Sequence, residues 1–217
     1  MKGLFITFEG NDGSGKSSAL QTVKQELLEL GYEVIYTREP GGSPIAEKIR
    51  EVILDKENVG MDPKTEALLY AASRREHIVK TILPALEAGK VILCDRFLDS
   101  SLAYQGYSRD LGLENVLEMN QFATEGLYPD LTILVCTRPE IGMSRIKKDE
   151  RDMDRLELEK MTFHNKVYDG YIALSEKFKY RIVVINGEQT KEQVLSDVKN
   201  VLYPFIKERI QWHMMNY

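Results

Sequence analysis

Cysteine is scarce in this sequence: Cys94 and Cys136 are the only two among 217 residues, and each lies in an apolar run. Two thiols in such positions do not form a disulfide framework, which favours a reducing compartment. Long apolar segments are also missing. The N-terminal run ends at Glu9, so it is too short for a signal peptide or a membrane span. We therefore expect a cytoplasmic protein that does not engage a membrane.

An excess of positive charge is the second absence. The chain has 29 lysines and arginines against 34 aspartates and glutamates, which gives a formal net charge of -5. Proteins that bind a nucleic-acid polymer neutralise its phosphates with a basic surface, so this balance excludes such a polymer as the main partner. A small phosphorylated ligand stays open, because one local cluster of arginines is enough to bind it.

Internal repeats, low-complexity tracts and proline-rich linkers are absent as well, so residues 1–217 read as a single domain. Five short apolar runs rich in β-branched residues alternate with longer segments of helical spacing. The runs are typical of strands buried on both faces of a parallel sheet: Leu4–Phe8, Glu33–Thr37, Val91–Cys94, Leu131–Cys136 and Arg181–Ile185. The alternation predicts a three-layer α/β fold, with a five-stranded parallel sheet flanked by helices.

Apolar stripes at helical spacing predict where the helices between these strands lie. The clearest stripes run over Leu20–Leu30, Ile45–Ile53, Ala67–Leu86 and Val194–Leu202. The segment Lys147–Arg155 differs, because it is dense in charge and lacks apolar anchors. It predicts a mobile segment on the surface of the domain.

Gly10 to Ser17 matches G-x-x-x-x-G-K-[ST], directly after a predicted strand and before a predicted helix. Glycines let backbone N–H groups curl around a triphosphate, and the N-terminus of the next helix favours negative charge. Lys16 is expected at the β- and γ-phosphates, and the Ser17 hydroxyl at Mg²⁺. A glycine-rich turn with a surface lysine is the alternative, and the flanking strand and helix argue against it.

The run VILCD, Val91–Asp95, brings a carboxylate to the C-terminal end of a predicted buried strand. Ligands of parallel α/β sheets collect at that edge. Asp95 is therefore a candidate for the outer coordination shell of the metal or for orienting the acceptor. An aspartate that caps the following helix is the alternative.

A phosphate-binding loop does not name a function, because switches, ATP-driven machines and small-molecule kinases all carry one. A guanine-binding switch would also carry N-K-x-D, whereas NKVYD at Asn165–Asp169 has its aspartate one position late. A non-catalytic ATPase switch or partition protein stays open. Arginines favour a phosphotransferase, since transfer between two anions needs positive charge on both sides of the moving group. Those near the expected edge are Arg38, Arg50, Arg74 and Arg96, and a second group contains Arg145, Arg151 and Arg155.

Six segments occur in the order seen in bacterial thymidylate kinases, and the chain resembles this family from Phe5 to about Ile185. They are FEGNDGSGKSS, TREPGG, LLYAASRREH, DRFLDSSLAYQG, GLYPDLT and RDMDRLE. The resemblance implies the P-loop nucleoside-monophosphate-kinase fold, a homodimer, and transfer of the γ-phosphate of ATP to dTMP with Mg²⁺, giving dTDP. A kinase for another nucleoside monophosphate, with dUMP closest in shape, is the nearest alternative.

For the acceptor side, the resemblance implies that Arg38 and Arg74 hold the acceptor phosphate. Tyr70, where the family usually has phenylalanine, would stack on thymine, and Tyr104 would exclude a ribose 2′-hydroxyl. Asp12 would face the acceptor sugar. In full, the implied substrate-binding residues are Asp12, Arg38, Glu39, Pro40, Arg50, Tyr70, Arg74, Arg96, Ser100, Ser101, Tyr104 and Gln105, of which Ser101 and Gln105 would read the polar edge of thymine.

For the donor side, the resemblance implies that Arg145 lies against the adenine and that the turn Asn186–Gln189 lines the base pocket. The residues expected around ATP are Gly10, Asn11, Asp12, Gly13, Ser14, Gly15, Lys16, Ser17, Ser18, Arg145, Gly187 and Gln189.

Some members of the family carry a catalytic arginine in the phosphate loop, just after the acidic residue. Gly13 occupies that position here, so the resemblance implies that arginines of a lid at about residues 143–157 replace it. Arg151 and Arg155 lie four apart, on one face if the segment is helical. Lid closure would bring at least one of them to the transferring phosphoryl group and exclude water. The catalytic residues expected are Lys16, Arg38, Asp95, Arg96, Arg151 and Arg155, with Ser17 and Asp95 at the metal.

Overall fold

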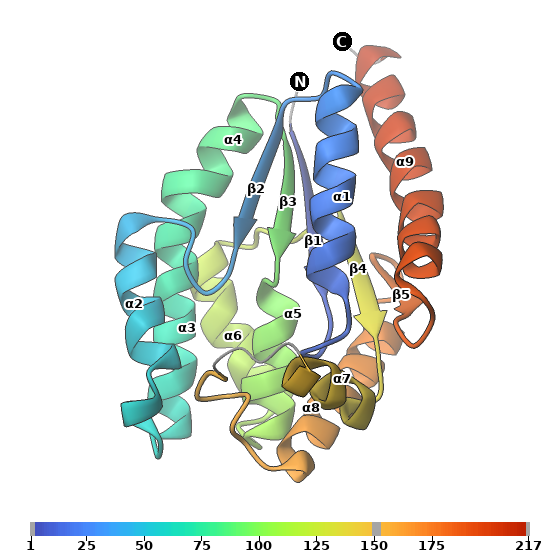
Figure 1. Ribbon diagram of the computed structural model, residues 1–217. Coiled ribbons are helices and arrows are strands. Elements are labelled where there is room, and N and C mark those ends of the chain that lie inside the picture. The colour runs from blue at the N-terminus through green and yellow to red at the C-terminus, as the bar shows by residue number, and fades with distance from the viewer. Residues whose placement is uncertain (1–2, 149–152, 216–217) are drawn as a thin grey trace.

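The computed structural model describes residues 3–148 and 153–215, and its five strands in these ranges form one parallel sheet. Their order is β2-β3-β1-β4-β5 (Figure 1). The strands are β1 (Leu4–Glu9), β2 (Val34–Arg38), β3 (Val91–Asp95), β4 (Leu131–Cys136) and β5 (Ile182–Asn186). Every residue of β1 and β4 is buried, because helices cover both faces of the sheet. Each strand begins and ends within one residue of its predicted range.

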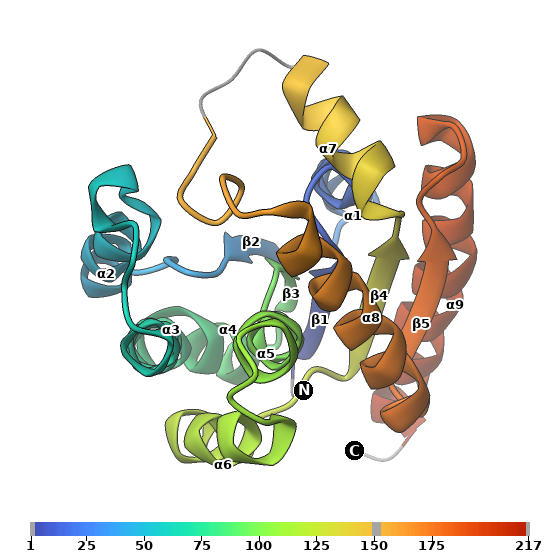
Figure 2. The same cartoon turned by 90° about the horizontal axis from the view of Figure 1, so that it is seen from below.

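Helices form the two outer layers (Figures 1 and 2). Their bounds are α1 (Lys16–Glu29), α2 (Pro44–Leu54), α3 (Pro63–His77), α4 (Leu83–Glu87), α5 (Leu98–Ser101), α6 (Leu113–Thr124), α7 (Pro139–Lys148), α8 (Met161–Lys177) and α9 (Lys191–Met215). A short 3₁₀ turn spans Lys56–Asn58, and π-helical turns span Ile78–Ile82 and Leu102–Ser108. The apolar faces of α1 and α9 pack on one side of the sheet, and those of α4, α5, α6 and α8 contribute to the core on the other. The three-layer α/β fold is therefore confirmed.

Local sequence explains where these helices begin and which face they bury. Ser43 and Asp62 cap α2 and α3 through their side chains, and a proline follows each cap. In α1, Leu20, Val23 and Leu27 lie on one stripe and are buried against the sheet. Each such side chain stabilises the fold by about 1.5–3 kcal/mol relative to an exposed position.

The register of the sheet gathers polar residues at its carboxyl edge. Arg38, the last residue of β2, pairs with Asp95 of β3, and Asp95 pairs with Phe8 of β1. Glu9 and the loop that follows it therefore lie beside Asp95 at the edge where parallel α/β folds bind ligands. Within the described part of the chain, no helix combines the length and apolar character needed to cross a membrane.

Candidate active site

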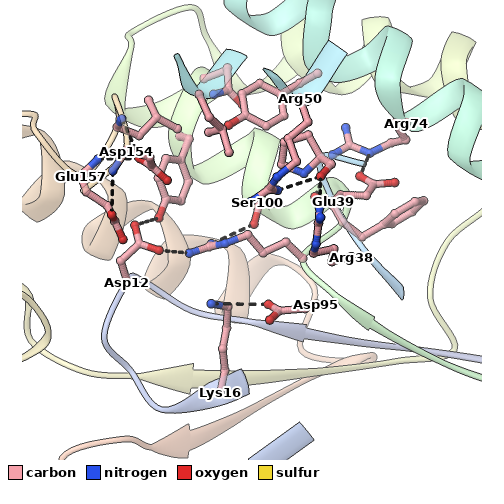
Figure 3. A pocket seen from close by; sticks show the side chains of 18 residues that line it. Asp12, Lys16, Arg38, Glu39, Arg50, Arg74, Asp95, Ser100, Asp154 and Glu157 are labelled. Atoms are coloured by element: carbon pink, nitrogen blue, oxygen red, sulfur yellow. Dashed lines mark hydrogen bonds and ion pairs between the residues drawn. The ribbon is translucent and has the colours of Figure 1, made fainter. Parts of the chain in front are cut away.

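The predicted phosphate loop connects β1 to α1 at the carboxyl edge of the sheet. Gly10, Gly13 and Gly15 have φ angles of 145°, 73° and 90°, a path that favours glycine. Lys16 begins α1, and its Nζ lies 3.4 Å from Asp95 Oδ1 (Figure 3). The loop thus brings a lysine and the N-terminus of a helix to one point, an arrangement that binds a phosphate chain.

Ser17 and Asp95 lie together beneath this loop. The Ser17 hydroxyl donates a hydrogen bond of 2.7 Å to Asp95 Oδ2. Burial alone would raise the pKa of Asp95, but the charges of Lys16 and Arg96 and the hydrogen bond from Ser17 lower it. The predicted metal-binding pair is therefore an anionic carboxylate in contact with a hydroxyl.

Helix α7 lies directly against the phosphate loop. A Cβ atom added to Gly13 would lie 2.1 Å from the carbonyl oxygen of Gly142, and one added to Gly142 would lie 2.3 Å from that of Asp12. Arg145 Nη1, one turn further along α7, donates to the carbonyl oxygens of Gly13 at 3.2 Å and Gly187 at 2.9 Å. Position 13 has no room for an arginine while α7 packs here.

A cavity of about 440 Å³ opens on the α9 side of the loop. It brings together six of the residues expected around ATP, namely Ser14, Gly15, Ser18, Arg145, Gly187 and Gln189. Its wall also contains Thr22 of α1 and, at the start of α9, Thr190 and Lys191, which no sequence pattern predicted. Gly10 and Asn11 instead pack beneath the loop: a Cβ on Gly10 would meet the Val135 carbonyl, and Asn11 Oδ1 accepts from the Thr137 amide.

A second cavity, of about 230 Å³, has Lys16 in its wall (Figure 3). Most of the residues expected around the acceptor line it, namely Asp12, Arg38, Glu39, Pro40, Arg50, Tyr70, Arg74, Arg96, Ser100, Tyr104 and Gln105, together with Lys16 and Asp95. Five of these are cationic, although the chain as a whole is acidic. We call this cavity the acceptor cleft. Tyr70 contributes a half-buried ring to it.

Arg38 and Arg50 converge in the acceptor cleft. Arg38 Nη1 and Arg50 Nη1 both donate to the Pro40 carbonyl oxygen, at 3.1 and 2.8 Å. Arg38 also pairs with Glu47 at 3.1 Å. Burial and then the charge of Arg38 lower the pKa of Arg50. Two like charges held at one carbonyl form a site that an anion would stabilise.

Arg96 connects the phosphate loop to the acceptor cleft. Its backbone has φ of 71°, in the left-handed region, and its guanidinium lies over the ring of Tyr104. One Nη pairs with Asp12, and the other donates to Ser100 Oγ at 3.2 Å. Tyr104 in turn donates to Asp12 at 3.0 Å. Burial opposes ionisation of Asp12, but Arg96 and Lys16 lower its pKa, so it is anionic.

Arg74 lines the acceptor cleft as expected, but most of its N–H groups are bound to neighbouring residues. It is 1% exposed, and its donors are directed at Glu39 (2.8 Å), Ser101 Oγ (3.0 Å), the Phe97 carbonyl (2.9 Å) and Asn120. Ser101 is itself buried, is not part of the cleft wall and contacts Arg74. Arg74 therefore lies with a residue expected at the base, whereas Arg38 and Arg50 form the pair suited to phosphate.

Arg155 was expected in a mobile surface segment, but its side chain is buried, and its role at the transferring phosphoryl group stays a prediction. It lies in a turn rather than a helix and is 4% exposed. Its Nη2 pairs with Glu66 at 2.8 Å, and its Nε donates to the Ile53 carbonyl at 2.7 Å. These bonds direct the guanidinium into the α2–α3 layer, because a buried carboxylate offers a stronger partner than solvent. Arg151 lies outside the described residues.

Two buried glutamates at the site were missed from the sequence. Glu9 accepts hydrogen bonds from the Phe97 amide, from Ser100 and from the Tyr171 hydroxyl. Burial, reinforced by Asp99, raises the pKa of Glu9 to about 7. Glu66 is fully buried inside α3. One sequence feature could have indicated a buried carboxylate: Glu9 directly continues the apolar run that precedes Gly10.

Comparisons with known proteins identify the family of this chain. The family model described as thymidylate kinase matches residues 8–198. The thymidylate kinases of Halalkalibacterium halodurans and Limosilactobacillus fermentum are 53% and 52% identical; the alignments cover 96% and 94% of this chain and 98% and 96% of theirs. The crystal structure of thymidylate kinase from Ehrlichia chaffeensis superposes with a TM-score of 0.75 at 33% identity, covering 93% of this chain and 99% of that one. The chain belongs to the thymidylate kinase family.

Proposed function

We propose that this chain transfers the γ-phosphoryl group of ATP to dTMP, producing dTDP and ADP in one in-line step. The observation that carries the proposal is the position of the phosphate loop between two cavities. Ser14, Gly15 and Ser18 line the cavity beside Arg145, whereas Asp12 and Lys16 line the acceptor cleft. A triphosphate bound along the loop therefore has its far end directed at the acceptor.

Charge neutralisation is the main chemical task of the site, because both reactants are anions. Arg38 and Arg50 bind the acceptor phosphate, and Lys16 and Arg96 stabilise the charge that develops on the transferred group. The acceptor oxygen is already ionised, so no strong general base is needed. Asp12 faces the acceptor sugar, where Tyr104 restricts the space for a 2′-hydroxyl.

Mg²⁺ fits the residues present. The donor set is the Ser17 hydroxyl and the Asp95 carboxylate, which are hard oxygen ligands of the kind that Mg²⁺ prefers. Among the described residues no group of three or more acidic, histidine or cysteine side chains could hold a metal, which is consistent with an ion bound largely by the nucleotide phosphates. Ser17 would bind the ion and Asp95 would order its waters; when bound, Mg²⁺ supplies charge neutralisation at the phosphates.

The chain acts as a single domain, 1–217, with a lid at about 143–157. Arg151 remains the candidate that reaches the transferring phosphoryl group, and Arg155 anchors the turn that follows. An arginine at the transferring group contributes on the order of 10³-fold in rate or more.

A homodimer formed through α3 and α6 is the assembly we propose. These helices pack against each other, and they leave Phe122 90% exposed and Leu68 58% exposed. Exposed apolar side chains of this size favour a protein interface. Sedimentation of a Phe122→Glu variant tests it, with loss of the dimer expected. The buried, unpaired cysteines support a reducing, cytoplasmic compartment.

An assay of ADP release with a panel of acceptors tests the activity. Release should require a nucleoside monophosphate and be fastest with dTMP, followed by dUMP. Equal release without any acceptor would favour an ATPase switch. Faster turnover of another monophosphate would assign a different acceptor to the same site.

A further inference from the structure

Glu66 lies behind the acceptor cleft, and one substrate-facing residue depends on it. Its side chain is 0% exposed, accepts hydrogen bonds from Gln105 and Arg109, and forms an ion pair with Arg155. Gln105 Nε2 donates to Oε1 at 2.9 Å, Arg109 Nη2 donates to Oε2 at 3.0 Å, and Arg155 Nη2 lies 2.8 Å from Oε2. Of these four residues, only Gln105 lines the acceptor cleft.

The charge state of Glu66 fixes what it can bind. Burial alone would raise its pKa, but the hydrogen bonds from Arg109 and Gln105, the positive charge of Arg109 and the contact with Arg155 lower it below the usual value. Glu66 is therefore a carboxylate, which accepts hydrogen bonds and cannot donate them. Any carboxamide that bonds to it must present its nitrogen.

Gln105 consequently has one orientation. Its side chain is buried, and its amide nitrogen is committed to Glu66. Among the described residues its carboxamide oxygen accepts no hydrogen bond, so this oxygen is the group that Gln105 offers to a ligand in the cleft. Arg74 also lines the cleft; four of its five guanidinium N–H groups are bound to neighbouring residues, which leaves one as a donor. An acceptor together with a donor complements a base edge that has an N–H next to a carbonyl.

We propose that Glu66 is a specificity-positioning residue: it locks Gln105 with its carbonyl oxygen toward the base, and thereby selects pyrimidines that carry N3–H. Thymine and uracil have N3–H beside a C4 carbonyl. Cytosine has a lone pair at N3 and an amino group at C4, so it places acceptor against acceptor. Arg109 and Arg155 serve this selection by keeping Glu66 ionised. The inference rests on the proposed function, since it assumes a pyrimidine nucleotide in the cleft.

The ratio of kcat/KM for dUMP to that for dCMP tests this directly, because the two differ only at the edge in question. Glu66→Gln keeps the size of the side chain but can donate as well as accept, so Gln105 can turn. We expect the ratio to fall on the order of ten-fold. Glu66→Asp keeps an acceptor-only carboxylate and should retain the ratio even if it lowers both rates. An unchanged ratio in Glu66→Gln, or an equal fall in both variants, overturns the proposal.

A surface pair offers a matched control. Gln25 donates to Glu29 at 3.0 Å on the exposed side of α1, with the same amide–carboxylate chemistry. Glu29→Gln should leave the dUMP to dCMP ratio unchanged. A fall in this variant equal to that of Glu66→Gln would show that the effect does not come from Gln105, and would overturn the proposal.

A measurement on the unmodified protein decides the matter if Glu66→Gln does not fold. In ¹H–¹⁵N spectra, the side-chain amide protons of Gln105 should exchange slowly with solvent, both free and with dTMP, while those of Gln25 exchange rapidly. Rapid exchange at Gln105, or protection that appears only with dTMP, overturns the proposal. Absence of dTMP kinase activity in the wild-type chain would instead reject the proposed function.

Discussion

The cavity beside Arg145, here called the donor side, and the acceptor cleft, here called the acceptor side, are suited to phosphate in different ways. On the donor side the chain offers mainly backbone: a glycine loop, a helix N-terminus, and carbonyl oxygens that hold Arg145. On the acceptor side it offers side chains, with Arg38 and Arg50 converging on one carbonyl and Arg96 braced by Asp12. Binding on the donor side should therefore weaken when an added atom separates two closely packed backbone segments. Binding on the acceptor side should weaken when one charged side chain is removed.

Lys16 lines the acceptor cleft at the end of the phosphate loop, and its removal should have the largest effect. Lys16→Ala deletes the charge nearest the transferred group, so kcat in the ADP-release assay should fall by on the order of 10³-fold or more. Lys24→Ala, on the same helix but over the ring of Tyr36, is the control and should keep wild-type rates. Wild-type turnover by Lys16→Ala would remove the loop from catalysis.

Gly13→Ala sharpens the description of the donor side. The new Cβ would lie 2.1 Å from the Gly142 carbonyl, so α7 must move away and carry Arg145 with it. We expect KM for ATP to rise on the order of ten-fold, with a smaller change in KM for dTMP. Gly31→Ala shares the positive φ, at 86°, but meets no atom within 4 Å, and it should change only stability. Equal effects of both variants on KM for ATP would contradict the contact with α7.

Glu9, on the acceptor side, gives a predicted effect on stability rather than on turnover. Its pKa is about 7 when folded and 4.5 when unfolded, so between these values the folded state holds a proton that the unfolded chain has released. Wild-type stability should therefore fall as the pH rises through this window. Glu9→Gln has no such proton. The free energy of unfolding of Glu9→Gln minus that of wild type should therefore increase by on the order of 1–3 kcal/mol between pH 5 and pH 8.

Urea unfolding at several pH values measures this difference. Glu188→Gln serves as control, because Arg138 lowers the pKa of that exposed carboxylate and no gain is expected above pH 5. A difference between Glu9→Gln and wild type that does not vary with pH would contradict the buried, proton-holding state of Glu9.

The two sides also differ in how far the sequence predicted them. The loop from Gly10 to Ser17 is contiguous, so its spacing alone indicated its path, and the apolar runs predicted every strand within one residue. The hydrogen-bond partners of Glu9 lie 88, 91 and 162 residues away in the sequence, and no local pattern predicts them. The burial of Arg155 was not predicted for the same reason. Its charged neighbours indicated solvent, whereas its partner Glu66 lies in a distant helix.

The apolar stripes likewise predicted where the helices lie better than they predicted which side chains are buried. Leu30 is 65% exposed and Ile45 is 51% exposed, although both fall on predicted stripes. Spacing marks the face of a helix but not how far neighbouring elements extend over it. The π-helical turn at Ile78–Ile82 was also not predicted, because the stripe continues through it.

The central claim is that cationic side chains bring two anionic nucleotides together, and Arg50 tests it most directly. Calorimetry should compare the binding of dTMP and of thymidine, which lacks the phosphate, to wild type and to Arg50→Met. We predict that the affinity for dTMP falls on the order of ten-fold or more while that for thymidine is unchanged. An equal loss for both ligands, or no loss for dTMP, would contradict the account.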